Sequence, residues 1–232
     1  MERAFMTTLI KKRFRQSLQT YDKNAIVQER MANKLIELLP KKPYRKILEI
    51  GCGTGLLTKK IASNFTPEIF TTNDIVEECE KYTKQIYPNT QFLSGDINKI
   101  LLPEKYDLII SNAVFQWFKN PENLIERLKQ HLEPNGIIAF SSFGNKNFYE
   151  IKELLNIGLS YNSFENITTD EIIELEFKTV SEMLRHIKNT GVNAIENYTL
   201  TKGKIELLEK QFLDKYGRIK LTYHPIFIII KG

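Results

Sequence analysis

Short apolar runs alternate with amphipathic segments through the middle of this chain. Five runs rich in Ile, Leu, Phe and Val predict strands, at 47–50, 68–72, 91–93, 106–111 and 136–140. The segments between them predict helices, at 55–64, 76–87 and 121–131. In the last of these, Leu124, Leu128 and Leu132 recur four residues apart. Strands that alternate with such helices form βαβ units, so the pattern predicts an α/β fold with a mostly parallel central sheet and helices on both faces.

Two regions depart from this rhythm. Residues 5–40 predict one or two helices before the first strand, and residues 145–200 carry mixed signals after the fifth. The signals in the second region are a helix near 147–158, an alternating apolar run at 172–177 and a helix near 179–188. The last apolar run, 221–230, predicts a terminal strand, in which Pro225 indicates a bulge, a bend or an edge position. The pattern does not assign the sixth strand.

Composition agrees with a globular domain, and the charge is unevenly spread. No apolar run approaches the ~20 residues of a membrane span, and the N-terminus lacks the apolar core of a secretion signal. We therefore expect a cytoplasmic protein with reduced thiols at Cys52 and Cys79. Residues 1–46 hold 12 Lys or Arg and 4 Asp or Glu, a net charge of +8, so the rest carries −3 of the total +5. Such a basic segment attracts an acidic partner or is a solvated face.

The first predicted strand runs into the glycine-rich segment EIGCGTG at 49–55. Gly51, Gly53 and Gly55 allow a ligand to approach the backbone closely. The dinucleotide fingerprint G-x-G-x-x-G does not fit, because Leu56 stands where its third glycine belongs. Glu49, directly before the loop, suits a ligand with an ammonium group better than a pyrophosphate. The pattern resembles motif I of Rossmann-like S-adenosylmethionine (SAM) dependent methyltransferases, and a plain turn is the alternative.

Polar residues follow the next strands in the order that a cofactor site requires. Asp74 stands 19 residues after the loop, where an acid accepts hydrogen bonds from ribose hydroxyls. The resemblance to SAM enzymes implies that Asp96 binds the adenine amino group and that Ile97 packs on the ring. Asn112 ends the fourth strand, where the reactive end of the cofactor is expected. Each of these residues alone could be a helix cap. Their occurrence together, in this order at the ends of successive predicted strands, predicts a SAM site.

The resemblance becomes narrower outside the cofactor motifs. It rests on the segments Arg13–Gln28, SNAVFQW at 111–117, FSSFG at 140–144, LRHIKNTGVN at 184–193 and LTYHPI at 221–226. These segments are similar, in order and over nearly the whole chain, to the malonyl-[acyl-carrier protein] O-methyltransferases of biotin synthesis. The last two are the specific part. The short tail, which stops at Gly232, departs from the family.

The resemblance implies methylation of the free carboxylate of a malonyl thioester on acyl carrier protein, which gives the methyl ester that starts the pimeloyl chain of biotin. A carboxylate with a pKa near ~4 needs no general base. The rate would come from holding its oxygen about 3–3.5 Å from the methyl group and from excluding water. We expect an acidic carrier protein as partner, no nucleic acid or membrane partner, and a monomer.

The resemblance also implies roles for individual residues. Arg185 is the predicted clamp for the carboxylate, because guanidinium binds carboxylate bidentately; a pair with Glu182 or a solvated position is the alternative. Tyr21 and Gln28, seven residues apart on one helix face, are expected to cover the methionine end of SAM, with Tyr21 positioning the reactants. The remaining predictions are Gln116, Trp117 and Lys188 for the substrate and Lys11, Lys12, Arg13 and Arg15 for carrier docking. A core position is the alternative for Trp117.

We interpret the chain as a single domain with four parts. They are a basic helical region at 1–45, a SAM-binding core at 46–144, a substrate lid at 145–200 and a terminal helix and strand at 201–232. No metal site is expected, since His131, His186 and His224 are dispersed without ligand spacing.

Three rival functions stay open. One is a SAM methyltransferase of another small acid, a quinone or a natural product, and another is a nucleic-acid methyltransferase, although no recognisable nucleic-acid module is present. The third is a non-catalytic SAM-fold binding subunit, which the intact glycine loop disfavours.

Overall fold

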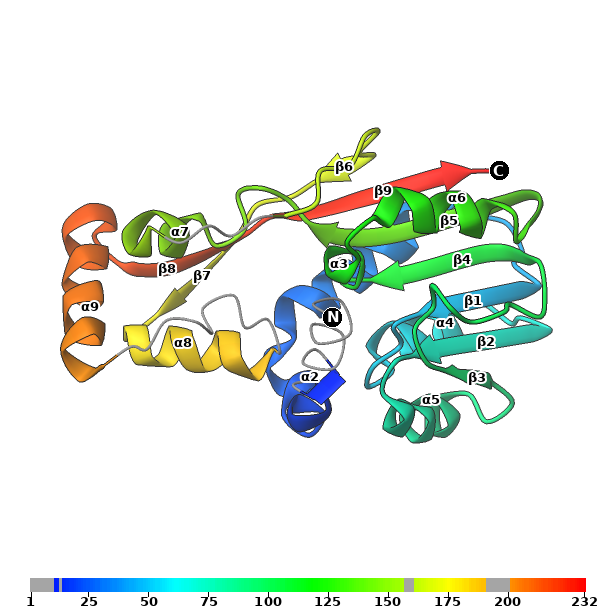
Figure 1. The fold of residues 1–232 in the computed structure, drawn as a ribbon, viewed down its shortest axis with the longest axis horizontal. Helices are drawn as coiled ribbons and strands as arrows, with labels where there is room; N and C mark the ends of the chain where they lie inside the picture. The colour runs from blue at the N-terminus through cyan, green and yellow to red at the C-terminus, as the bar shows by residue number, and fades with distance from the viewer. Residues whose placement is uncertain (1–10, 13, 157–160, 191–200) are drawn as a thin grey trace.

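A computed structural model describes residues 11–12, 14–156, 161–190 and 201–232, and it contains one large and one small sheet (Figure 1). The strands of the large sheet are β1 (Lys46–Ile50), β2 (Ile69–Asp74), β3 (Gln91–Ser94), β4 (Tyr106–Asn112), β5 (Leu132–Phe143), β6 (Thr169–Asp170) and β9 (Pro225–Lys231). Their order is β3-β2-β1-β4-β5-β9-β6, with β1 to β5 parallel and β9 antiparallel to both of its neighbours.

Helices cover both faces of the large sheet. They are α2 (Tyr21–Asn24), α3 (Ile26–Leu38), α4 (Leu56–Asn64), η1 (Glu77–Cys79), α5 (Glu80–Ile86), η2 (Phe115–Trp117) and α6 (Pro121–Lys129). Successive strand residues enter opposite hydrophobic clusters: Ile47 packs with Leu35 of α3, whereas Leu48 packs with Leu128 of α6. Strands that are apolar on both faces are typical of a covered parallel sheet. The predicted fold class is confirmed.

A smaller unit extends from one end of this sheet, at the left of Figure 1. It consists of α7 (Tyr149–Leu155), β7 (Ile173–Phe177), α8 (Val180–Asn189), α9 (Lys202–Tyr216) and β8 (Ile219–Tyr223). β7 and β8 form an antiparallel pair against which the helices pack. The small unit therefore contains elements from the predicted lid, 145–200, together with α9 and β8 from the part of the chain after residue 200. One element of the predicted lid, β6, lies in the large sheet instead.

The last strands differ from the sequence-based expectation. The run at 221–230, predicted as one strand, is divided between β8 in the small sheet and β9 in the large sheet. His224 separates the two, and Pro225 begins β9, so the expected bend is present and carries the chain from one sheet to the other. The sixth strand, which the pattern did not assign, is the two-residue β6.

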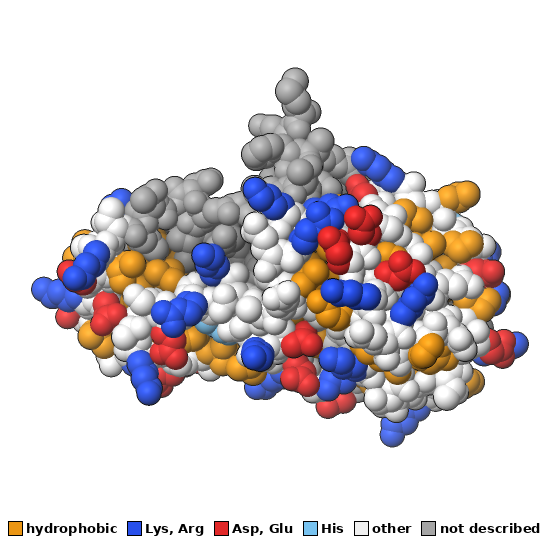
Figure 2. Space-filling view, turned by 90° about the horizontal axis from the view of Figure 1, so that it is seen from below, with side chains coloured by type: hydrophobic (Ala, Val, Ile, Leu, Met, Phe, Trp, Pro, Cys, Tyr) orange, Lys and Arg blue, Asp and Glu red, His pale blue; other side chains and the backbone are white. Residues whose placement is uncertain are grey.

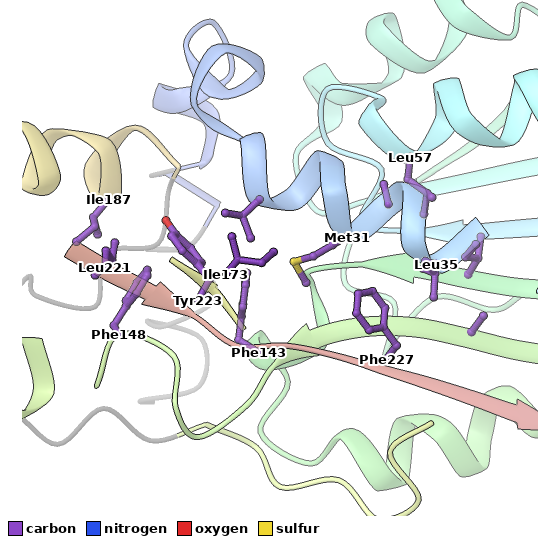
Figure 3. Close-up of a cluster of buried hydrophobic side chains, with 14 of the residues drawn as sticks. Met31, Leu35, Leu57, Phe143, Phe148, Ile173, Ile187, Leu221, Tyr223 and Phe227 are labelled. Atoms are coloured by element: carbon purple, nitrogen blue, oxygen red, sulfur yellow. The ribbon is translucent and has the colours of Figure 1, made fainter. Parts of the chain in front are cut away.

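One hydrophobic cluster joins the two units (Figure 3). It runs from Leu57 and Leu35 beside the large sheet, through Met31 and Phe143, to Tyr223 and the α8 residue Ile187. The small unit is therefore packed on the main core through buried side chains. None of the helices in the described ranges is long and apolar enough to cross a membrane.

Candidate functional site

The glycine loop adopts a backbone conformation that only glycine takes without strain. Gly51 has φ +70° and Gly53 has φ +55°. A Cβ on Gly51 would lie 2.4 Å from Cγ2 of Val114, and one on Gly53 would lie 2.9 Å from Cζ of Phe14. Val114 and Phe14 therefore pack closely on the loop. The loop lies at the carboxyl end of β1, the edge at which open α/β sheets bind ligands.

Asp74 closes this loop from the end of β2. It is 5% exposed, and its Oδ2 accepts a hydrogen bond from the Gly53 N–H at 2.9 Å while Oδ1 accepts from the Val76 N–H at 2.8 Å. Burial raises the pKa of Asp74, and these backbone donors act in the opposite direction. The predicted ribose acid is thus beside the glycine loop, as the sequence pattern requires.

Two buried acceptor oxygens near this edge have no hydrogen-bond partner in the described part of the chain. Glu49 is 1% exposed; its Oε2 accepts from the Thr58 hydroxyl at 2.7 Å, but Oε1 has no donor among the described residues. The same is true of the buried Oε1 of Gln28. Burial raises the pKa of Glu49 to about 8 in spite of the Thr58 hydrogen bond. A buried carboxyl and a buried amide oxygen that lack donors fit the ammonium group of a ligand.

Asn112 has a different position from the one expected of a free cofactor-binding group. Its Nδ2 donates to the backbone oxygen of Gln28 at 2.9 Å, and its Oδ1 accepts from the Ser141 hydroxyl at 2.6 Å. The side chain therefore ties α3 to the ends of β4 and β5.

The residues predicted to bind adenine follow β3. Asp96 accepts at Oδ1 from the backbone N–H of Asn98 at 3.0 Å, and Ile97 is buried among core residues.

Helix α2 lies against the loop. The Thr54 hydroxyl donates to Oδ1 of Asp22 at 2.5 Å, a contact that the sequence did not indicate. The ring of Tyr21 packs edge-on against Phe14 with centroids 5.2 Å apart. Because Phe14 also lies over Gly53, Tyr21 is close to the glycine loop. Burial, followed by the negative charges of Asp22 and Asp74, raises the pKa of the Tyr21 hydroxyl.

The predicted acceptor residues occupy the turn after β4. Gln116 donates from Nε2 to the backbone oxygen of Ala113 at 2.6 Å, so its amide is used to stabilise the turn. Trp117 is 38% exposed, which excludes the alternative of a core tryptophan. An exposed indole next to the carboxyl end of β4 is available to contact an acceptor.

Arg185 and Lys188 lie exposed on α8. The predicted alternative of a pair with Glu182 is not observed, because Glu182 caps the helix: its Oε2 accepts from the Lys178 N–H at 2.9 Å. Arg185 makes no hydrogen bond or ion pair within the described ranges. Its helix reaches α2 one turn later, where Asn189 donates to Asn24 at 3.5 Å. Arg185 therefore lies one turn before the point at which α8 meets α2.

The basic residues predicted to dock a carrier protein are not equivalent. Arg15 is paired with Glu78, at 2.6 Å, and with Glu77, at 3.5 Å. Lys12 is exposed and Lys11 is half-buried, whereas Arg13 lies outside the described residues. Figure 2 shows that Lys and Arg side chains on one face are interleaved with acidic ones.

Comparison with known proteins gives consistent relatives. A family model described as a methyltransferase domain matches residues 23–192. Proteins named malonyl-[acyl-carrier protein] O-methyltransferase are similar at 35% identity in Bacteroides thetaiotaomicron, over 97% of each chain, and at 36% in Calditerrivibrio nitroreducens, over 95% of each. The chain spans about half the length of a Bacteroides fragilis relative of that name, at 36% identity over 96% of this chain.

Solved structures agree with the fold. The plantazolicin methyltransferase BpumL, in complex with a substrate analogue and S-adenosylhomocysteine (SAH), superposes with a TM-score of 0.57 at 18% identity, over 100% of this chain and 97% of that one. A methyltransferase from Bacillus halodurans gives a TM-score of 0.58 at 13% identity, over 86% and 97%. By its family model and its full-length relatives, the chain belongs to the methyltransferase-domain family and, within it, to the malonyl-[acyl-carrier protein] O-methyltransferases.

Proposed function

We propose that this chain uses SAM to methylate the free carboxylate of the malonyl thioester carried by acyl carrier protein, giving the methyl ester that starts pimeloyl synthesis for biotin. The observation that carries the proposal is the similarity, over nearly the whole chain, to relatives with that name in separate organisms. The unpaired acceptors beside the glycine loop support it independently, because they suit the amino-acid end of SAM.

The residues around the loop would hold the cofactor by complementary chemistry. Glu49 and Gln28 would accept from its ammonium group, and Asp74 would accept from ribose hydroxyls with lone pairs that its backbone donors leave free. Asp96 would accept from the adenine amino group, with Ile97 against the ring. When bound, SAM supplies a methyl group on a sulfonium sulfur, which keeps the bonding electron pair as the acceptor oxygen takes the methyl carbon.

The chain's own contribution to the reaction is positioning. A malonyl carboxylate is ionised at neutral pH, so no side chain has to remove a proton. Tyr21 would hold the reactants in line and, with the predicted lid at 145–200, exclude water. Trp117 and Gln116 would line the acceptor, and Arg185 and Lys188 on α8 would attract its carboxylate.

Docking of the carrier protein would use the basic N-terminal region. The carriers of such acyl groups are acidic, and complementary charge accelerates encounter. Lys12 is the strongest of the described candidates, because it is exposed and pairs with no acid among the residues that the structure describes, whereas Arg15 already pairs with two glutamates. Lys11 and Arg13 belong to the same proposed surface.

The proposal is tested by methyl transfer from isotopically labelled SAM to malonyl-acyl carrier protein, followed by intact-protein mass. Carrier protein without malonyl and malonyl-CoA run alongside. We expect a gain of one methyl group on the malonyl carrier and none on the unloaded carrier. SAH binding without transfer to any malonyl thioester would overturn the acceptor and leave a methyltransferase of another acid.

A further inference from the structure

A tyrosine that the sequence analysis did not single out lies beside the proposed acceptor residues. Tyr161 precedes Asn162, whose Nδ2 donates to the backbone oxygens of Phe115, at 3.1 Å, and Phe118, at 2.9 Å. These two oxygens belong to the turn that carries Gln116 and Trp117. Two hydrogen bonds from one side chain thus fix the Tyr161 segment to the turn where an acceptor is expected.

The direction of the Tyr161 hydroxyl is set by Asn147. Asn147 is fully buried, and its Oδ1 accepts from the backbone N–H of His224 at 3.2 Å. Because a backbone N–H only donates, the amide orientation is decided, and its Nδ2 must be the atom that donates to the Tyr161 oxygen at 3.0 Å. The Tyr161 proton is left without an acceptor among the described residues, so the hydroxyl is a donor held ready for a ligand.

The surroundings keep this hydroxyl protonated. Tyr161 is half-buried, and burial raises its pKa to about 12. Its side chain packs against the hydrophobic cluster that contains Tyr223. Tyr223 is fully buried and hydrogen-bonded to His186 at 2.8 Å, and its hydroxyl points from β8 toward the end of α8 and the N-terminal helices (Figure 3). Tyr161, which is half-buried, is therefore the more accessible of these two hydroxyls.

We propose that the Tyr161 hydroxyl donates a hydrogen bond to the carboxylate of the methyl acceptor and that Asn147 is the positioning residue that aims it. This inference rests on the proposed function, since it assigns a contact to that substrate. A carboxylate has two oxygens, so one can accept from Tyr161 while the other takes the methyl group. The hydrogen bond is charge-assisted with the carboxylate, and we expect it to be made equally in the ground state and in the transition state. Its loss is therefore expected in KM rather than in kcat.

The test compares Tyr161→Phe with Tyr44→Phe, a control whose lost hydroxyl donates to the backbone of Pro40 at the opposite end of β1. For Tyr161→Phe we expect the KM for malonyl-acyl carrier protein to rise about tenfold to hundredfold, with kcat and the Kd for SAH each within about twofold. Tyr44→Phe should leave all three unchanged. A KM for Tyr161→Phe equal to that of the unsubstituted protein would overturn the assignment, whereas failure of the unsubstituted protein to methylate this acceptor would count only against the proposed function.

The positioning role is tested with Asn147→Asp. The new carboxylate would accept the Tyr161 proton, so the hydroxyl remains but donates inward. We expect the same rise in KM as for Tyr161→Phe and no further rise in the double variant, with the fold checked by thermal unfolding. Additive effects would show that Asn147 acts independently of Tyr161 and would overturn its role. If Asn147→Asp fails to fold, Asn147→Ser, which cannot span both partners, replaces it with the same expectation.

Discussion

At the scale of single residues, the charge of Glu49 depends on what lies beside it. Its pKa of about 8 means that the ligand-free protein holds a mostly protonated carboxyl at pH 7. An ammonium group would favour the ionised form, so we expect SAH binding at pH 7 to release about one proton. Calorimetry in buffers of different ionisation enthalpy measures this release. Glu49→Gln should abolish it and the exposed control Glu29→Gln should not; release that survives Glu49→Gln would assign the proton to another group.

The same carboxyl makes stability depend on pH. Because the pKa of Glu49 is raised in the folded state, folded molecules bind more protons than unfolded ones between the usual value of 4.5 and about 8. This group's stabilising contribution is complete below that window and is lost as the pH rises through it. We expect Glu49→Gln to stabilise the ligand-free protein more at pH 8 than at pH 5, with a difference of up to a few kcal/mol in the free energy of unfolding. The Tm of both proteins, measured at the two pH values, checks this. An equal change in Tm on Glu49→Gln at both pH values would contradict a raised pKa of Glu49 in the folded protein.

Sequence motifs could predict the cofactor residues because the predicted set is local: a glycine loop and the polar residues that end successive strands. They could not identify contacts between distant segments. Asp22 meets Thr54 across 32 positions, and Asn147 meets Tyr161 across 14 that include α7. No spacing rule marks such pairs, because they depend on how helices and loops pack on the sheet.

At the scale of elements, one buried carboxylate joins α7 to β8. Glu150 is fully buried and accepts from the Thr222 N–H at 3.0 Å and from the Thr222 hydroxyl at 2.5 Å. We expect Glu150→Ala to lower the free energy of unfolding by about 2–4 kcal/mol, because it leaves two buried donors unpaired. Glu153→Ala, on the same helix but at an exposed ion pair with Lys215, should cost less than about 1 kcal/mol. Urea unfolding measures both, and equal losses would refute the assignment.

The strands also show where pattern reasoning ends. β1, β4 and the centre of β5 were predicted because parallel strands that are buried on both faces read as continuous apolar runs. β8 and β9 form one such run in the sequence, and only their different partners, β7 and β5, separate them. β6 is two residues long, too short for any periodicity. Strand identity at this end is therefore decided by non-local pairing.

At the scale of the whole molecule, the continuous hydrophobic cluster couples the two units. We expect the sheet and the small unit to unfold together, because separating them would expose Phe143, Tyr223 and their neighbours. The chain has one tryptophan, Trp117, beside the large sheet, so its fluorescence reports that unit while far-UV circular dichroism reports all helices and strands. Coincident denaturant curves are expected, and a separate second transition in circular dichroism would contradict the coupling.

The charge distribution belongs to this scale too. If the basic N-terminal region steers an acidic carrier, Lys12→Glu should raise the KM for malonyl-acyl carrier protein at low ionic strength, and the difference should shrink as salt screens the charges. Lys41→Glu makes the same charge change just before β1, at the opposite edge of the sheet, and serves as the control. An effect of equal size in both variants would point to net charge instead of a docking surface.

The passage of the chain from β8 to β9 restricts how this protein can change in evolution. In β9, Ile226 and Ile228 pack on the α6 side of the sheet, whereas Phe227 packs on the α3 side. Because strand side chains alternate with a period of two, one residue inserted at His224 would exchange these sets. Surface loops accommodate length variation at little cost. At this junction, however, the strands on both sides, β8 and β9, are paired with other strands. The number of residues at this junction therefore has to stay constant.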